Sequence, residues 1–167
     1  MLQTERLILK PLSPEDEYGI YRIMADENVK QTYLVPDFPS EEAGLKTAHR
    51  LIAISADEKH CILGIYLESV LIGLINDVEW GEDSVEMGYV IASDYQNRGY
   101  ATEAFRAVIP HLFQRGLKKV IAGAFATNLA SIRVMEKCGM TKIQKKAEIE
   151  YRGKLHRCVY YAIKASE

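Results

Sequence analysis

Gln96-Asn97-Arg98-Gly99-Tyr100-Ala101-Thr102 is the stretch around which the rest of the chain is organised. It follows an apolar run, Val85 to Ile91, and precedes a helical pattern that begins near Thr102. A loop that opens a helix presents backbone N–H groups and the positive end of the helix dipole to an anion. Gly99 lets the backbone approach a ligand without a Cβ in between, and Ala101 is nearly as small. The stretch therefore predicts a site for a phosphate or pyrophosphate.

Composition narrows the class of protein. The length of 167 residues predicts one domain, residues 1–167, and 48% hydrophobic with 26% charged residues is ordinary for a globular protein. A net charge of −2 disfavours a dedicated nucleic-acid binder. The three cysteines, Cys61, Cys138 and Cys158, form no Cys-x-x-Cys pair and no His/Cys cluster, so we expect no disulfide and no metal. Without a signal segment or a long apolar run, we expect a cytoplasmic protein that does not contact a membrane.

Periodic patterns and turn residues predict the element order β-α-α-β-β-β-α-β-α-β-β. Strands are expected at Arg6 to Lys10, Cys61 to Leu67, Val70 to Val78, Val85 to Ile91, Val120 to Phe125, Met140 to Glu150 and Leu155 to Lys164. Helices are expected to start at Ser13, at Ser40, near Thr102 and near Asn128, with a loop over Asn28 to Pro39 and a kink at Pro110. A meander followed by a β-α-β unit predicts an α/β (α+β) fold, a mixed, mostly antiparallel sheet of about seven strands with helices on both faces.

Two other phosphate-binding motifs fit the loop poorly. A P-loop is excluded, because no Gly-Lys-Ser/Thr follows at the required spacing. Gly99-x-Ala101-x-x-Ala104 is a weak form of the dinucleotide fingerprint. That fingerprint, however, belongs to a first β-α turn with an acid about 20 residues later, where this chain has Lys118 to Gly123. We therefore set the dinucleotide interpretation aside.

Four segments in sequence order resemble the GNAT superfamily of N-acetyltransferases. Gln96-x-x-Gly99-x-Ala101 matches the acetyl-CoA signature of that family, [Gln/Arg]-x-x-Gly-x-[Gly/Ala]. Asn128 to Met140 is similar to the Asn-x-x-Ser…Glu-Lys-x-Gly-Phe segment of the branch that acetylates the N-termini of ribosomal proteins. Met1 to Leu12 and Glu86 to Ile91 resemble the opening and the fourth strand of that branch. The resemblance covers nearly the whole chain and implies the GNAT fold.

The resemblance also implies a set of residues that bind acetyl-CoA. The backbone N–H groups of the loop would hold the pyrophosphate, with Arg98 making a charge-assisted contact. The strand before the loop would separate from its neighbour and pair with the pantetheine amides, and a backbone N–H there would stabilise the oxyanion. A contact from the start of the next helix completes the set. The residues are Tyr89, Val90, Ile91, Gln96, Asn97, Arg98, Gly99, Tyr100, Ala101, Thr102, Asn128 and Ser131.

The reaction that the resemblance implies is attack of a neutral amine on the thioester. An alkylamine with a pKa near 10.4 is mostly protonated at neutral pH, so a base has to remove a proton. Glu86 is the leading candidate, directly or through a water, although it could also be an exposed strand residue. Ser131 is the positional match for the acid that protonates the leaving thiolate, and Tyr160 or Tyr161 could substitute for it.

Several of these residues also have simpler interpretations. Asn128 is a preferred N-cap residue in any protein, and serine is common in a first helical turn. Cys138 is expected to be a small core residue, and the basic residues between Lys142 and Arg157 are expected to form the solvated face of a hairpin. Val90 stands where the ribosomal branch has a large aromatic residue, which puts specificity for peptide N-termini in doubt.

The predicted function is therefore transfer of an acetyl group from acetyl-CoA to a primary amine, either a protein N-terminus or a small molecule. A non-catalytic acyl-CoA-binding or regulatory module on the same fold is the alternative, and a protein that binds a nucleotide cofactor is a third. The sequence leaves the acceptor open, and it is compatible with a monomer or a homodimer.

Overall fold

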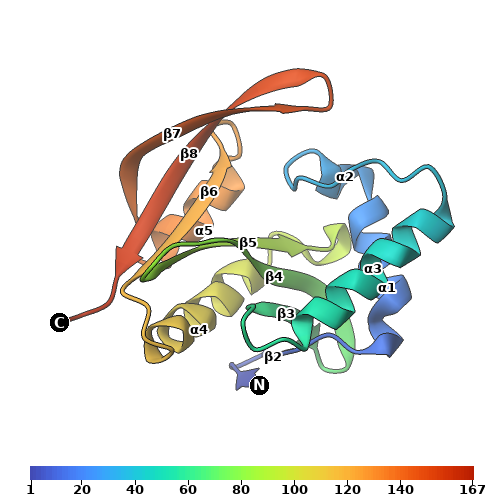
Figure 1. Cartoon of the computed structure of the whole chain (residues 1–167), viewed down its shortest axis with the longest axis horizontal. Helices are drawn as coiled ribbons and strands as arrows, with labels where there is room; N and C mark the ends of the chain where they lie inside the picture. The colour runs from blue at the N-terminus through green and yellow to red at the C-terminus, as the bar shows by residue number, and fades with distance from the viewer. The chain divides into compact units, whose positions relative to one another are not determined.

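The computed structural model describes residues 1–167 as helices and a mixed sheet of eight strands in the order β1-β2-β3-β4-β5-β6-β8-β7. Strands β5 and β6 run parallel, whereas β1–β2, β2–β3, β3–β4, β6–β8 and β7–β8 are antiparallel pairs. The predicted mixed, mostly antiparallel sheet is confirmed (Figure 1). The eighth strand is the two-residue β1, which is too short to show a pattern in the sequence.

The chain forms two compact units. The first unit contains Met1–Asn76 and Tyr89–Ala107, and the second contains Asp77–Gly88 and Val108–Glu167. Because β4 (Val70–Trp80), β5 (Ser84–Ile91) and α4 (Tyr100–Gln114) have residues in both units, the division does not follow element boundaries. The prediction of one domain over residues 1–167 is not tested by this division and stays a prediction.

The first unit packs two helices together beside antiparallel strands (Figure 1). Its remaining elements are β1 (Leu2–Gln3), β2 (Leu7–Lys10), the 3-10 helix η1 (Pro14–Asp16), α1 (Glu17–Ala25), α2 (Glu27–Lys30), α3 (Glu41–Ser55), β3 (Ile62–Leu67) and the 3-10 helix η2 (Ser93–Tyr95). Helix α1 packs against α3, with Ile20 and Ala48 fully buried. The predicted helix starts are confirmed, since the Asp16 carboxylate accepts a bond from the Ser13 N–H and the Ser40 hydroxyl accepts one from the Ala43 N–H.

The expected loop over Asn28 to Pro39 was wrong in its first residues, because the short helix α2 lies there. The Asp26 carboxylate accepts a hydrogen bond from the Asn28 N–H at 2.9 Å and so caps this helix. Val29 and Lys30 are buried. A single helical turn is too short to show a 3.6-residue period, so only the capping residue could have indicated it.

The second unit places a long hairpin and a helix around β6 (Figure 1). Its elements are the last part of β4, the first part of β5, the last part of α4, β6 (Lys119–Phe125), α5 (Leu129–Lys137), β7 (Thr141–Tyr151) and β8 (Lys154–Lys164). The predicted stop of α5 is confirmed, because Gly139 follows it with φ +82°, a conformation that favours glycine. The hairpin turns at Arg152 and Gly153, which also have positive φ.

Helix α4 begins at Tyr100 and continues through Pro110 to Gln114. It starts slightly earlier than the expected position near Thr102, directly after Gly99. Pro110 is exposed and does not end the helix, and a bend of the helix axis at this residue stays a prediction. The N-terminus of α4 therefore lies directly after the loop that contains Gly99.

Candidate active site

The loop before α4 turns twice through the left-handed region of the backbone. Asn97 has φ +62° and Gly99 has φ +83°. Asparagine tolerates this region and glycine adopts it without strain. Backbone that alternates between right-handed and left-handed conformations is found in concave anion sites, where successive N–H groups point to one side. The Glu103 N–H donates a hydrogen bond to the Gly99 carbonyl at 3.0 Å, so the first turn of α4 follows the loop directly.

Gln96 holds the start of the loop. Its Nε2 donates a hydrogen bond to the Ile91 carbonyl at 2.9 Å, which ties the loop to the end of β5. The Ala92 N–H donates to the Ile72 carbonyl at 2.8 Å and fixes the same strand end against β4. The side chain at the first signature position is exposed, and its hydrogen bond ties the loop to the strand end.

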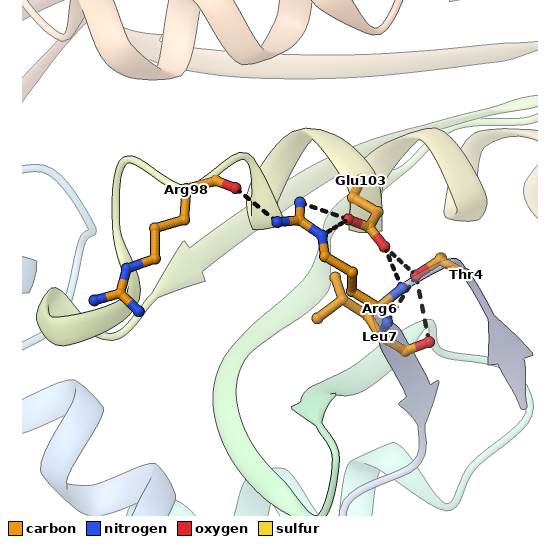
Figure 2. Close-up of polar contacts among 5 residues, drawn as sticks. All are labelled: Thr4, Arg6, Leu7, Arg98 and Glu103. Carbon is orange, nitrogen blue, oxygen red and sulfur yellow. Dashed lines mark hydrogen bonds and ion pairs between the residues drawn. The ribbon is translucent and has the colours of Figure 1, made fainter.

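An ion pair from the N-terminal segment supports the other side of the loop. Nε of Arg6 donates to Glu103 Oε2 at 2.7 Å, and the Arg6 N–H donates to Oε1 at 2.8 Å. Thr4 donates its hydroxyl to Oε1 at 2.6 Å. Another nitrogen of the Arg6 guanidinium donates to the carbonyl of Arg98 at 3.1 Å, so the same side chain joins α4 to the loop (Figure 2).

The electrostatics of this cluster keep Glu103 ionised. Although burial alone would raise the pKa of Glu103, the hydrogen bonds from Thr4 and Arg6 and the Arg6 charge lower it below its ordinary value. The Arg6 guanidinium also lies 4.5 Å from the centre of the Tyr100 ring. Sequence reasoning missed this network because 97 residues separate Arg6 from Glu103, and a single sequence carries no signal for that pairing.

Arg98 is exposed, and its side chain extends away from the Arg6–Glu103 pair (Figure 2). Its guanidinium lies 5.9 Å from the centre of the Tyr95 ring. Arg6 therefore binds the carbonyl of Arg98, whereas the residue itself is exposed to solvent.

The pairing of β5 with β6 stops before β5 ends. The parallel ladder of β5 with β6 runs from Ser84 beside Lys119 to Met87 beside Ala122, although β5 continues to Ile91. The Tyr89 ring packs on Phe105 of α4 with ring centres 5.2 Å apart. Val90 is buried at 6% exposure, so its side chain belongs to the core of the first unit.

Asn128 caps α5 in the second unit. Its Oδ1 accepts a hydrogen bond from the Ser131 N–H at 3.2 Å, which is the ordinary role of an N-cap asparagine. Ser131 is half-buried in the first turn of α5. The structure thus gives Asn128 a structural role, and a CoA contact by either residue stays a prediction.

Glu86 forms an ion pair with Lys145 of β7. The Lys145 Nζ lies 3.2 Å from Glu86 Oε2, and the Glu86 side chain is 14% exposed while that of Lys145 is 42% exposed. The same Nζ lies 4.4 Å from the centre of the Tyr160 ring. Lys145 is exposed, as expected for a solvated face, and the end of its long side chain also reaches Glu86 and Tyr160. No sequence pattern indicated this contact.

The two candidate tyrosines on β8 point to opposite faces, as neighbours on a strand do. Burial and then the Glu86 charge raise the pKa of Tyr160, so its hydroxyl keeps its proton at neutral pH. Tyr161 donates to Glu136 of α5 at 3.2 Å, and burial together with this bond raises its pKa as well. Tyr160 therefore shares surroundings with Glu86, whereas Tyr161 faces α5.

The cysteines and the other features of the chain support no further type of catalytic centre. Burial and the Glu86 charge raise the pKa of the Cys158 thiol, which makes it a poor nucleophile at neutral pH. All three cysteines are free and buried. No group of three or more His, Cys, Asp or Glu side chains is arranged to hold a metal ion. None of the helices is both long enough and apolar enough to cross a membrane.

The predicted residues fall into two sets. Tyr89 to Ile91 and Gln96 to Thr102 belong to the first unit, where the structure brings the strand end and the loop together. Glu86, Asn128 and Ser131 belong to the second unit. Within the second unit, Glu86 meets Lys145 and Tyr160, while Ser131 meets Asn128.

Comparisons with known proteins decide the family. Residues 6–141 match the family described as Acetyltransferase (GNAT) domain. The chain belongs to this family. The GNAT chain is 32% identical over 143 residues to YnaD, an uncharacterized N-acetyltransferase of Bacillus subtilis (strain 168). The aligned region covers 84% of this chain and 82% of the relative. These matches support an acetyl-CoA-dependent N-acetyltransferase, and not a non-catalytic acyl-CoA-binding module.

Solved structures agree on the fold. A GNAT-family acetyltransferase from Bacillus anthracis superposes with a TM-score of 0.82 at 26% identity, covering 98% of this chain and 97% of that one. A ribosomal L7/L12 alpha-N-protein acetyltransferase in complex with coenzyme A has a TM-score of 0.82 at 16% identity, covering 96% and 95%. The second likeness shows the fold alone.

Proposed function

We propose that the chain transfers the acetyl group of acetyl-CoA directly to a primary amine, with both substrates bound at the same time. The observation that carries the proposal is the loop from Gln96 to Thr102. Positive φ angles at Asn97 and Gly99, directly before α4, favour N–H groups that converge on one ligand. A pyrophosphate is an anion of the size and charge that such a site binds.

The donor is held mainly through backbone groups. In the proposal, the N–H groups of Asn97 to Thr102 bind the pyrophosphate, the Arg98 guanidinium adds a charged contact, and Gln96 keeps the loop in place. Backbone groups of Tyr89, Val90 and Ile91, at the end of β5, bind the pantetheine. Asn128 and Ser131 contribute a contact from the start of α5.

The chemistry needs one proton acceptor and one proton donor. The amine nitrogen, once deprotonated, attacks the thioester carbon, so that a C–N bond forms and the C–S bond breaks. Glu86, directly or through a water, takes the proton that the amine loses. The thiolate receives a proton from a hydroxyl, either that of Ser131 or that of Tyr160, whose raised pKa keeps it protonated at neutral pH. The Glu136 bond makes Tyr161 the weaker candidate for this role.

The acceptor is a primary amine, either a protein N-terminus or a small molecule such as a polyamine, an amino acid or an aminoglycoside. We propose that residues 1–167 act as one domain, as a monomer or a homodimer. We further propose that they act in the cytoplasm, where reducing conditions keep the three cysteines free. The proposed acetyl transfer requires no metal.

Binding and turnover test the proposal separately. CoA at about 100 times its Kd should stabilise the protein by about 2.7 kcal/mol and raise its Tm by about 5–10 °C. A screen of amines and short peptides with acetyl-CoA should release free thiol with at least one acceptor. Protection by NAD or ATP in place of CoA would instead indicate a nucleotide cofactor, and binding of CoA without thiol release from any amine would contradict the catalytic part.

A further inference from the structure

One face of the second unit carries an aromatic surface built around a glycine. Tyr160 of β8 pairs with Gly123 of β6. A Cβ on Gly123 would lie 2.7 Å from the Cε1 atom of the Tyr160 ring, so the ring lies over β6 only because this residue has no side chain. Tyr160 is held in this position, with 7% of its surface exposed.

Glu86 lies on the same face of the sheet as this ring. It pairs with Ile121, which is two residues before Gly123 on β6, and residues two apart on a strand point to the same face. The carboxylate of Glu86 and the Tyr160 ring therefore border one position, and Glu79 of β4 adds a second negative charge that acts on it.

An alkylammonium group already occupies that position. The Nζ of Lys145 lies 3.2 Å from the Glu86 carboxylate and 4.4 Å from the centre of the Tyr160 ring. A carboxylate beside an aromatic ring binds an ammonium through a charge-assisted hydrogen bond and a cation–π contact. Although burial lowers the pKa of Lys145, the charge and hydrogen bond of Glu86 raise it overall, so the group stays charged.

The two partners are held with unequal strength. The Glu86 side chain is 14% exposed and lies on a central strand, whereas Lys145 is 42% exposed at the end of a long flexible side chain. Ion pairs with this degree of exposure are weak and exchange readily. The carboxylate and the ring are thus fixed, and the cation is the part that another molecule can displace.

We propose that Glu86 and the Tyr160 ring bind the ammonium group of the acceptor, and that Lys145 occupies this place until the acceptor displaces it. The proposal rests on the proposed function, since it names the class of acceptor. The group that the site holds is an unbranched primary alkylammonium. The structure therefore favours a flexible primary alkylamine over an amine next to a peptide carbonyl, and Lys145 acts as an internal competitor.

Direct binding tests this without acetyl transfer. The probe is n-butylammonium, which has the length of a lysine side chain, and binding is followed by NMR of ring-labelled tyrosines in the absence of CoA. Lys145→Met removes the internal cation but keeps an apolar stem, and Lys146→Met is the matched control on the neighbouring exposed residue. We expect Lys145→Met to tighten binding about two- to sixfold, and Lys146→Met to leave it unchanged.

Two further arms separate the outcomes. Adding Glu86→Gln to Lys145→Met should abolish the gain, and n-butanol, which has no charge, should not bind. Equal Kd values for the wild type and Lys145→Met, equal gains in both methionine variants, or equal binding of n-butanol would each overturn the proposal. Because no acetyl-CoA is present, failure of the proposed function appears in the thiol-release screen and not in this experiment.

Discussion

At the scale of single residues, the small side chains of the loop matter because they leave room for the proposed pyrophosphate. Ala101 lies in the first turn of α4, one residue after the helix begins and two after Gly99. A carboxylate there would face the proposed pyrophosphate at the helix N-terminus. Two like charges about 4 Å apart near a protein surface repel by about 4 kcal/mol before screening by salt.

Ala101→Asp should therefore weaken binding of acetyl-CoA by about ten- to a hundredfold. Isothermal titration calorimetry with CoA measures the effect. Ala53→Asp, at an exposed alanine of α3, is the control for adding an acid to a helix, and it should bind CoA as the wild type does. Unchanged affinity in Ala101→Asp would show that the pyrophosphate lies elsewhere.

Glu103 is the residue whose charge connects the N-terminal segment with α4. Its pKa is lowered in the folded state, so its contribution to stability is present above the ordinary value of 4.5 and is lost as the pH falls through the folded value. Glu103→Gln should cost about 1–3 kcal/mol of unfolding free energy at pH 7, because Arg6 and Thr4 lose a charged acceptor.

The difference between the wild type and Glu103→Gln should shrink below pH 4.5, the ordinary pKa of the group. Urea unfolding at a series of pH values measures it, with Glu5→Gln, at an exposed neighbour of Arg6, as the control. If the support of the loop is also functional, Glu103→Gln raises the KM for acetyl-CoA while kcat stays close to that of the wild type. A pH-independent difference would contradict the assigned ionisation.

At the scale of elements, what the sequence predicts depends on how local the cause is. The cap of α5 by Asn128 and its end at Gly139 could be read from neighbouring residues, and both are confirmed. The turn α2 was missed because one helical turn has no period. The Arg6–Glu103 and Glu86–Lys145 pairs join residues 97 and 59 positions apart, and no local pattern reports such contacts.

Gly123 of β6 pairs with Tyr160 of β8, and one added methyl group at Gly123 should destabilise the protein. Gly123→Ala brings a Cβ to 2.7 Å from the buried Tyr160 ring, so the ring or the strand has to move. We expect a loss of about 1–3 kcal/mol of unfolding free energy, the usual cost of overpacking. Urea unfolding monitored by circular dichroism measures this loss.

A double-mutant cycle identifies the ring as the cause. Tyr160→Leu removes the ring, so Gly123→Ala should cost clearly less in that background than in the wild type. Gly116→Ala is a useful comparison, because Gly116 has φ +95° with no atom within 4 Å of its added Cβ, and its cost comes from backbone strain alone. Equal costs of Gly123→Ala in both backgrounds would show that the ring does not rest on this glycine.

At the scale of the whole molecule, the order of elements was predictable and the sharing of elements between the two units was not. Strand and turn patterns are local, so the meander and the final hairpin could be read directly from the sequence. The boundaries of the units fall inside β4, β5 and α4, where the sequence shows no linker. The predicted site residues Glu86 and Tyr89 are close in the sequence but belong to different units for the same reason.

Interleaved elements predict that the two units unfold together. Helix α4 has residues in both units, and melting one unit alone would break that helix near Ala107 and interrupt strands β4 and β5. We therefore expect one cooperative transition in urea, with a single midpoint for probes in both units. Trp80, the only tryptophan, reports the second unit by its fluorescence.

Pulsed alkylation with mass spectrometry supplies the second probe. Cys61 lies in the first unit and Cys158 in the second, and both thiols are buried in the folded chain. If residues 1–167 form one domain, both cysteines become reactive at the urea concentration where the Trp80 fluorescence changes. Alkylation of Cys61 at a clearly lower urea concentration than Cys158 would mean that the units open separately, because a thiol reacts only in the states that expose it.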